Sequence, residues 1–147
     1  MSLELVLGTV FFMEALSYQQ EIVPGSEEAQ RVVCKVIERI QNDWNFNNVE
    51  MARLIHVRPN TYGNWLKNKK VPIGKAPLLA EMEAIICVIA IHRSLSAMFS
   101  NPCDQVLWLN SPHPDFGESS PREHACQSCA GLFYLKNYLD YIRGRGA

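Results

Sequence analysis

The side chains best suited to chemistry lie in a short basic segment between Met51 and Ala80. This segment contains no acidic residue and six basic ones, which are Arg53, Arg58, Lys67, Lys69, Lys70 and Lys75. The rest of the chain, with eight basic and fifteen acidic residues, has a net charge of −7. A basic segment in an acidic chain is typical of a surface that faces phosphate groups, although a solvated lysine-rich loop gives the same charge pattern.

A second group of reactive side chains is the cluster His124-x-Cys126-x-x-Cys129. Imidazole and thiolate groups at this spacing are ligands of structural zinc sites, which need a second pair of ligands. Cys103 and His113 are the remaining candidates for that pair, and nothing in the sequence requires them to converge. We therefore expect reduced thiols and no metal, and we keep a small metalloprotein as an alternative.

Motifs of the common enzyme classes are missing from the sequence. It has no glycine-rich phosphate loop, no nucleophile elbow and no His-Glu-x-x-His run, and its carboxylates are scattered without an obvious pair. We therefore expect no catalytic residue, no cofactor and no enzymatic activity.

The composition is that of a folded protein with one domain, or two small domains that share a core. The chain has 147 residues, of which 48% are hydrophobic and 20% charged. Its longest apolar run, from Ala84 to Ile91, is too short to cross a bilayer, and no Lys or Arg precedes Arg31, so the basic start of a signal peptide is missing. Cys34 and Cys87 lie in apolar runs and favour a reducing compartment. We expect a cytoplasmic protein with no membrane association.

The spacing of apolar residues predicts an all-α fold that begins with an N-terminal extension, residues 1–25. A helix is expected over residues 1–22, followed by a break at Pro24-Gly25. Ser26 can cap the next helix, whose apolar stripe runs from Val32 to Ile40. A polar break over residues 42–48 follows, with an aromatic pair, Trp44 and Phe46, that we expect to pack inward.

The remaining helices belong to two predicted units, residues 26–76 and residues 77–147. Two short helices are expected over residues 49–55 and from Pro59 to about residue 68, and a long helix from Pro77 to about residue 99. A short helix capped by Asn101 should run through residue 108. A capping box at residues 120–123 should begin the last helical stretch, which Gly144 can end.

The two short helices have the features of a DNA-reading pair. Ala52 allows a close helix crossing, and Tyr62, Trp65 and Leu66 have the spacing of an inward face. The opposite face offers Arg and Asn, which can pair with guanine and adenine in the major groove, and lysines follow that can meet phosphates. A glycine, Gly63, would allow close approach to DNA. The predicted DNA-binding residues are Arg58, Asn60, Thr61, Asn64, Lys67, Lys69 and Lys70.

This segment, from Met51-Ala52 to Leu66-Lys67, resembles the Xre-type (phage repressor-like) helix-turn-helix family. The sequence differs from the family pattern at His56 and Asn68, where that family usually or often has glycine. Asn tolerates a left-handed backbone better than His does, so the turn at His56 could be strained or shaped differently. Two other interpretations remain open: an ordinary helical hairpin whose polar face is only solvated, and a protein-interaction module that no longer binds DNA.

A stiff loop follows Trp108-Leu109, with two prolines, an aromatic anchor and a Ser-Pro helix start. It resembles the toxin-binding domain of the Xre/MbcA/ParS antitoxin family, in which a helix ending in Trp-Leu precedes a proline and glycine loop. A rigid loop without a ligand would have the same pattern. The sequence departs from the family over residues 126–130, and residues 1–22 have no clear counterpart.

The resemblance implies a type II antitoxin that forms a dimer, caps a cognate toxin, often of the NAD-consuming RES class, and represses its own operon. The toxin would be the enzyme. The residues implied in toxin binding are Trp108, Asn110, Pro112, Phe116 and Gly117 in the loop, with Tyr141, Arg143 and Arg145 as candidates at the C-terminal end.

Overall fold

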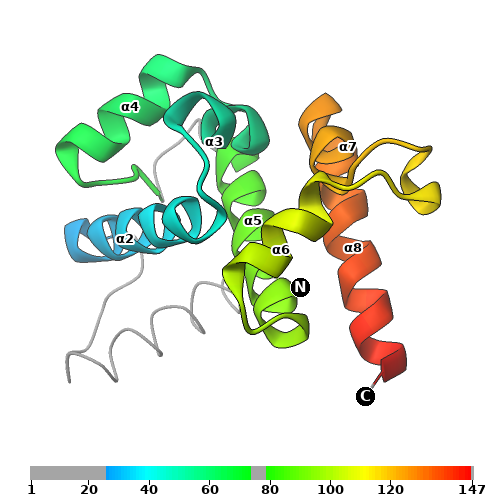
Figure 1. Cartoon of the computed structure of the whole chain (residues 1–147). Coiled ribbons are helices and arrows are strands. Elements are labelled where there is room, and N and C mark those ends of the chain that lie inside the picture. Colours follow the sequence, from blue (N-terminus) through cyan, green and yellow to red (C-terminus); the bar gives the residue numbers. More distant parts are fainter. Residues whose placement is uncertain (1–25, 74–78, 147) are drawn as a thin grey trace.

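The structure, a computed structural model, describes residues 26–73 and 79–146 and confirms the all-α prediction (Figure 1). The described residues form α-helices and one short 3-10 helix, without a strand. Their bounds are α2 Glu27–Trp44, α3 Asn48–Ile55, α4 Pro59–Asn68, α5 Leu79–Met98, α6 Pro102–Asn110, η1 Pro114–Phe116, α7 Pro121–Gln127 and α8 Cys129–Gly146. The predicted helix over residues 1–22, the break at Pro24-Gly25 and the predicted helix start at Pro77 lie outside the described residues.

The start of α2 confirms the cap expected at Ser26, whose Oγ accepts a hydrogen bond from the Ala29 N–H at 3.1 Å. The helix runs further than predicted and ends only where Asn45 adopts a left-handed conformation (φ 53°). It continues because Trp44 lies on the same face as the apolar stripe and is buried. Phe46 is buried as well, as expected.

Helices α3 and α4 pack against each other and are joined by a three-residue connection, residues 56–58 (Figure 1). A capping box begins α3, since the Asn47 side chain accepts from the Glu50 N–H and the Glu50 carboxylate accepts from the Asn47 N–H. Pro59 occupies the first turn of α4, where its missing N–H costs nothing. Both helices match the predicted bounds within a residue or two.

Helix α5 is the central element and packs against α2, α3, α6 and α8 (Figure 1). Its apolar centre is mostly buried, while Ile86 and Ala90 stay half-buried. His92 at its C-terminal half is the satisfied, partly buried histidine that its position suggests, because Nε2 lies 2.8 Å from an Asp43 carboxylate oxygen. No single helix in the described ranges is long and apolar enough to span a membrane; α5 and α6 would reach that length only together, across a 116° bend.

The predicted capping box at Ser120 and Glu123 is confirmed and begins α7. The last stretch is divided by Ser128, whose extended backbone (φ −163°) separates α7 from α8. At this junction Gly131 lies so close to α7 that an added Cβ would be 2.1 Å from the His124 carbonyl oxygen. Helix α8 does not end at Gly144 but continues to Gly146.

The two predicted units share one core. Helices α2–α4 and helices α7–α8 lie on opposite sides of α5 (Figure 1), yet α6 packs on α2 and α7 packs on α3. The Trp44 indole N–H donates to Gln105 Oε1 at 3.0 Å, and the Gln105 amide donates to the Phe99 carbonyl at 3.0 Å. This buried chain of bonds fixes α6 against α2.

Candidate functional site

The outer face of α4 carries the polar side chains that the sequence predicted. Asn60, Asn64 and Lys67 are exposed on this face, and Arg58 is exposed at the N-cap. Thr61 is half-buried. An added Cβ at Gly63 would meet nothing within 4 Å, so the backbone there is open to close approach. The structure therefore brings most of the predicted DNA-binding residues onto one accessible surface.

The inner face of α4 is held firmly against α2 and α3. Tyr62 is fully buried and its hydroxyl donates to Gln41 Oε1, whose amide in turn donates to Asn48 Oδ1 at 2.8 Å. Burial raises the pKa of Tyr62 far above its usual value, so it is a neutral donor. Trp65 is 6% exposed. These contacts join α2, α3 and α4 and fix which side of α4 faces outward.

Lys69 and Lys70, predicted to meet phosphates, are engaged in ion pairs with α2. Lys69 Nζ lies 2.8 Å from Glu38 Oε1, and Lys70 Nζ lies 2.5 Å from Glu27 Oε1. The hydrogen bond to Glu38 also raises the pKa of Lys69. Phosphate contact by either lysine would have to compete with these carboxylates.

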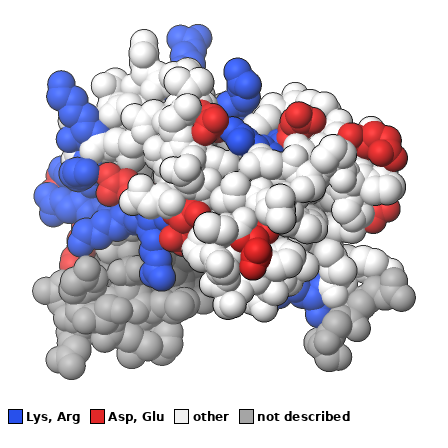
Figure 2. All heavy atoms as spheres, in the orientation of Figure 1, with Lys and Arg blue, Asp and Glu red and all other residues white. Residues whose placement is uncertain are grey.

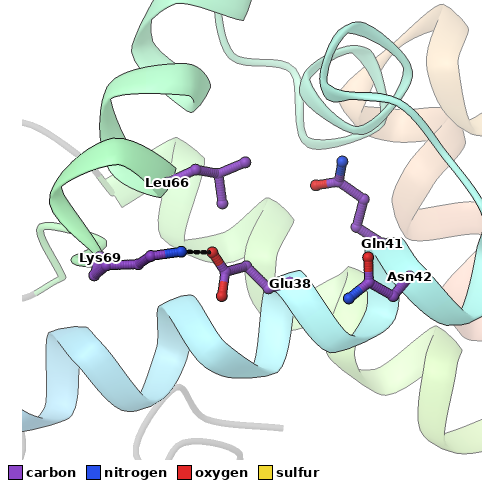
Figure 3. A pocket seen from close by; sticks show the side chains of 5 residues that line it. All are labelled: Glu38, Gln41, Asn42, Leu66 and Lys69. Atoms are coloured by element: carbon purple, nitrogen blue, oxygen red, sulfur yellow. Dashed lines mark hydrogen bonds and ion pairs between the residues drawn. The ribbon is translucent and has the colours of Figure 1, made fainter.

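An open pocket of about 320 Å³ lies between α2 and the end of α4 (Figure 3). Figure 3 shows Lys69 reaching across from the end of α4 to Glu38 on α2, which closes one side of the pocket. The lining residues are Glu38, Gln41, Asn42, Leu66 and Lys69.

Charge is divided unequally between the two halves of the described chain. Residues 26–73 carry eight basic and five acidic residues (+3), and residues 79–146 carry five basic and seven acidic residues (−2). In Figure 2, Lys and Arg gather on the left over α2 and α4, whereas Asp and Glu are spread over the whole face, from among these basic side chains to the right edge. Part of this basic surface comes from Arg31, Lys35 and Arg39, exposed on α2. Their four-residue spacing, which places them on one side of the helix, is the signal in the sequence that could have indicated this surface.

The turn between α3 and α4 contains the one departure from the repressor-like pattern that the structure explains. His56 adopts a left-handed backbone (φ 63°, ψ 38°), the conformation for which glycine is suited. Its ring Nε2 lies 2.8 Å from the Ala125 carbonyl oxygen of α7. The sequence could not indicate this contact, because the two residues are far apart in the chain.

The second candidate surface is the loop between α6 and α7, which is organised around Phe116. This ring is 2% exposed, so it supports the loop and cannot itself contact a partner. Aromatic rings surround it with centroid distances of 4.9 to 6.2 Å, and they are those of Trp108, His113, His124, Tyr134 and Tyr138.

Two tyrosines of α8 fasten this loop by hydrogen bonds. The Tyr134 hydroxyl donates to the Asp115 carbonyl at 2.9 Å, and the Tyr138 hydroxyl donates to Asp115 Oδ2 at 2.8 Å. Burial and the bond to Asp115 raise the pKa of Tyr138 to about 12. Neither tyrosine was a predicted site residue, although Tyr134, Tyr138 and Tyr141 repeat at helical spacing.

The other implied toxin-binding residues are distributed over two regions. Trp108 is half-buried beside Phe116, while Asn110, Pro112 and Gly117 are exposed in the loop. Further along α8, Tyr141 is 61% exposed. The Arg143 guanidinium donates to Ser94 Oγ on α5 at 3.1 Å. The side chain of Arg145 lies outside the described part. A large exposed side chain that the sequence analysis did not single out, that of Leu107, lies on α6 next to Trp108.

The cysteine and histidine cluster does not form a metal site in the described ranges. No group of three His, Cys, Asp or Glu side chains there could hold a metal ion. His124 packs instead against Phe116 and Tyr134. The thiols of Cys34 and Cys87 are buried, and burial raises their pKa to about 11 and about 12. This geometry gives the metalloprotein alternative no support.

In comparisons with known proteins, the chain matches no protein-family model and no curated protein.

Proposed function

We propose that this chain is a cytoplasmic antitoxin that binds operator DNA through α3 and α4 and a cognate, RES-like toxin through the loop between α6 and α7. In this proposal it is a homodimer, since two-fold protein symmetry matches palindromic half-sites. It represses its own operon and has no catalytic role itself.

The observation that carries the DNA-binding half is the two-sided character of α4. Its inner face is fixed by buried Tyr62 and Trp65, and its outer face offers Asn60, Asn64 and Lys67 to the surroundings. Amide groups can pair bidentately with adenine, and Arg58 at the helix start can pair with guanine. The basic surface over α2 and α4 (Figure 2) supports approach to a polyanion.

The toxin-binding half is supported by the surface around the loop. Leu107, Tyr134 and Tyr141 are large and 67%, 44% and 61% exposed, and tyrosine is enriched in protein interfaces. The rigid core around Phe116 presents this surface in a fixed shape. The predominance of acidic residues in this half makes a second DNA contact there unfavourable.

Fluorescence anisotropy with a labelled duplex from the region upstream of the gene tests the DNA-binding half. If all six basic residues of the segment met phosphates, log affinity would fall against log salt with a slope of about −5 per protomer, and with Lys69 and Lys70 held by their carboxylates it would be about −4. Replacing Arg58 and Asn64 by Ala should relax sequence preference. Arg93→Ala, an exposed arginine on α5, is the charge-matched control. A flat salt response would contradict the proposal.

Co-expression with the neighbouring reading frame tests the toxin-binding half. Rescue of cell growth together with a co-purifying complex supports the antitoxin assignment. Tyr134→Ala and Leu107→Ala should weaken that complex, because both side chains are exposed on the proposed surface. Toxicity that persists in the presence of this chain would refute it.

A second candidate function, a protein-interaction module that does not read DNA, is favoured by the ion pairs of Lys69 and Lys70. Both lysines already neutralise carboxylates of α2. The anisotropy experiment separates the two functions, since such a module would bind neither the upstream duplex nor an unrelated one.

A further inference from the structure

The backbone of His56 is in the left-handed conformation, which is uncommon for a residue with a Cβ. With φ 63° and ψ 38° it ends α3, and its N–H donates to the Arg53 carbonyl at 3.2 Å. The next N–H, that of Val57, donates to the Ala52 carbonyl at 3.0 Å. A residue with a Cβ is disfavoured in this region, glycine is not, and Asn tolerates it better than most. Backbone preference alone favours glycine here, and it does not distinguish a histidine from an asparagine, since both are enriched in this region.

The imidazole ring makes a contact that neither glycine nor asparagine could make. Its Nε2 is 2.8 Å from the carbonyl oxygen of Ala125, which is fully buried on α7. A carbonyl oxygen accepts only, so Nε2 carries the proton in this bond. The histidine thus connects the turn before α4 to a helix of the other half of the chain.

Arg122 makes a second, independent link across the same interface. Its guanidinium lies 3.2 Å from Glu50 Oε1 on α3, donates to Asn110 Oδ1 at 3.2 Å, and has its Cζ 4.1 Å from the centre of the Phe46 ring. These contacts keep α7 on α3 when His56 is changed, so a His56 variant loses one bond without releasing the helix.

We propose that His56 is a positioning residue for the DNA-reading helix: it ties the α3–α4 turn to α7 and so fixes the direction in which α4 leaves. The proposal rests on the function proposed above. Helix α4 starts at Pro59, three residues after the tie, and Tyr62 and Trp65 hold its inner face, so freedom of the turn acts mainly on the first turn of α4, where Arg58 and Asn60 lie. Helix α7 is thereby part of the support of the DNA-binding surface.

Three substitutions at one position separate this role from a backbone effect. His56→Gly and His56→Asn suit the left-handed backbone but lose the bond, because the glycine has no side chain and the Asn amide is too short. His56→Gln suits the backbone less well, yet its Nε2 can take the place of the imidazole Nε2. If the backbone conformation of residue 56 is what matters, the Gly and Asn variants should bind DNA most tightly. If the bond to α7 is what matters, the Gln variant should.

The readouts are anisotropy on the upstream duplex, amide exchange at His56 and Val57, and thermal unfolding. We expect Gly and Asn to weaken DNA binding about fivefold, the equivalent of one hydrogen bond, and Gln to stay within about twofold of the wild type. Amide exchange at His56 and Val57 should be faster in the Gly and Asn variants than in the Gln variant and the wild type. The melting temperatures should change little, because the relieved backbone offsets the lost bond.

Equal or tighter DNA binding by His56→Gly, with unchanged exchange at Val57, would overturn the inference. If the wild-type chain does not bind the duplex, the proposed function fails by itself. The amide exchange rates of the three variants then still show whether His56 holds the turn. If His56→Gly and His56→Asn protect the turn amides better than His56→Gln does, the bond to Ala125 does not hold the turn.

Discussion

Phe116→Ala should be among the most damaging substitutions in the chain. The ring is 2% exposed, and its closest aromatic neighbour, Tyr138, has its centroid at 4.9 Å. Truncating a buried Phe costs about 3–5 kcal/mol. We therefore expect a loss near the middle of that range, about 4 kcal/mol, and a fall of about 8–16 °C in melting temperature for a chain of this size. Phe116→Leu, which keeps most of the volume, should lose about 1–2 kcal/mol.

Urea unfolding followed by far-UV circular dichroism measures these losses, and near-UV circular dichroism reports the packing of Trp108 against Phe116. Leu107→Ala is the control, since this side chain is 67% exposed and should change stability by no more than about 0.5 kcal/mol. If Phe116→Ala is no more destabilising than the control, the loop is not held by the aromatic core, and the reasoning about a preformed surface is wrong.

Three further predictions concern backbone space and titration. Gly131→Ala should destabilise the chain by about 1–3 kcal/mol, because its Cβ would lie 2.1 Å from the His124 carbonyl oxygen. Gly63→Ala, where an added Cβ meets nothing within 4 Å, should stabilise it by about 0.5–1 kcal/mol. Thermal unfolding of the two variants checks both signs, and equal shifts in melting temperature would contradict them. The hydrogen bond from the Asn47 N–H lowers the pKa of Glu50. The Glu50 carboxylate therefore contributes stability above its unfolded pKa, and this contribution is lost as pH falls through its folded pKa. Glu50→Gln should flatten the acid side of a plot of unfolding free energy against pH. The pKa of Tyr138 is raised to about 12, so its contribution is present below the unfolded pKa of about 10 and lost as pH rises through the folded value. Tyr138→Phe should reduce that alkaline loss in urea unfolding, and an unchanged loss would exclude the Asp115 bond as its source.

Much of the fold could be predicted because its signals are local. Ser26, Asn101 and Ser120 each cap the helix that follows, since a cap depends on residues two or three positions away. The break at Ser128 does have a local signal, because the Ser128 Oγ caps α8 by accepting a hydrogen bond from the Gly131 N–H at 2.9 Å. The close approach of α8 to α7 at Gly131 is tertiary, and the sequence did not indicate it.

The candidate site was predictable only on its exposed side. Helical spacing placed Asn60 and Asn64 outward, as the structure has them. Pairing across the chain was invisible to the sequence, so Lys69 was expected at phosphates although it meets Glu38. Phe116 was expected to be an anchor, but the two tyrosines that fasten its loop lie 19 and 23 residues after Asp115, and their helical spacing did not indicate this contact.

The fastening of the loop has a consequence for how fast and how tightly a partner can bind. Asp115 is held by both tyrosine hydroxyls, so residues 113–117 are already ordered before a complex forms. Ordering costs subtract directly from affinity, and a rigid surface avoids them. Association should then proceed without a slow conformational step, at a rate governed by collision and charge, and the lifetime of the complex should depend on the exposed Leu107 and Tyr141.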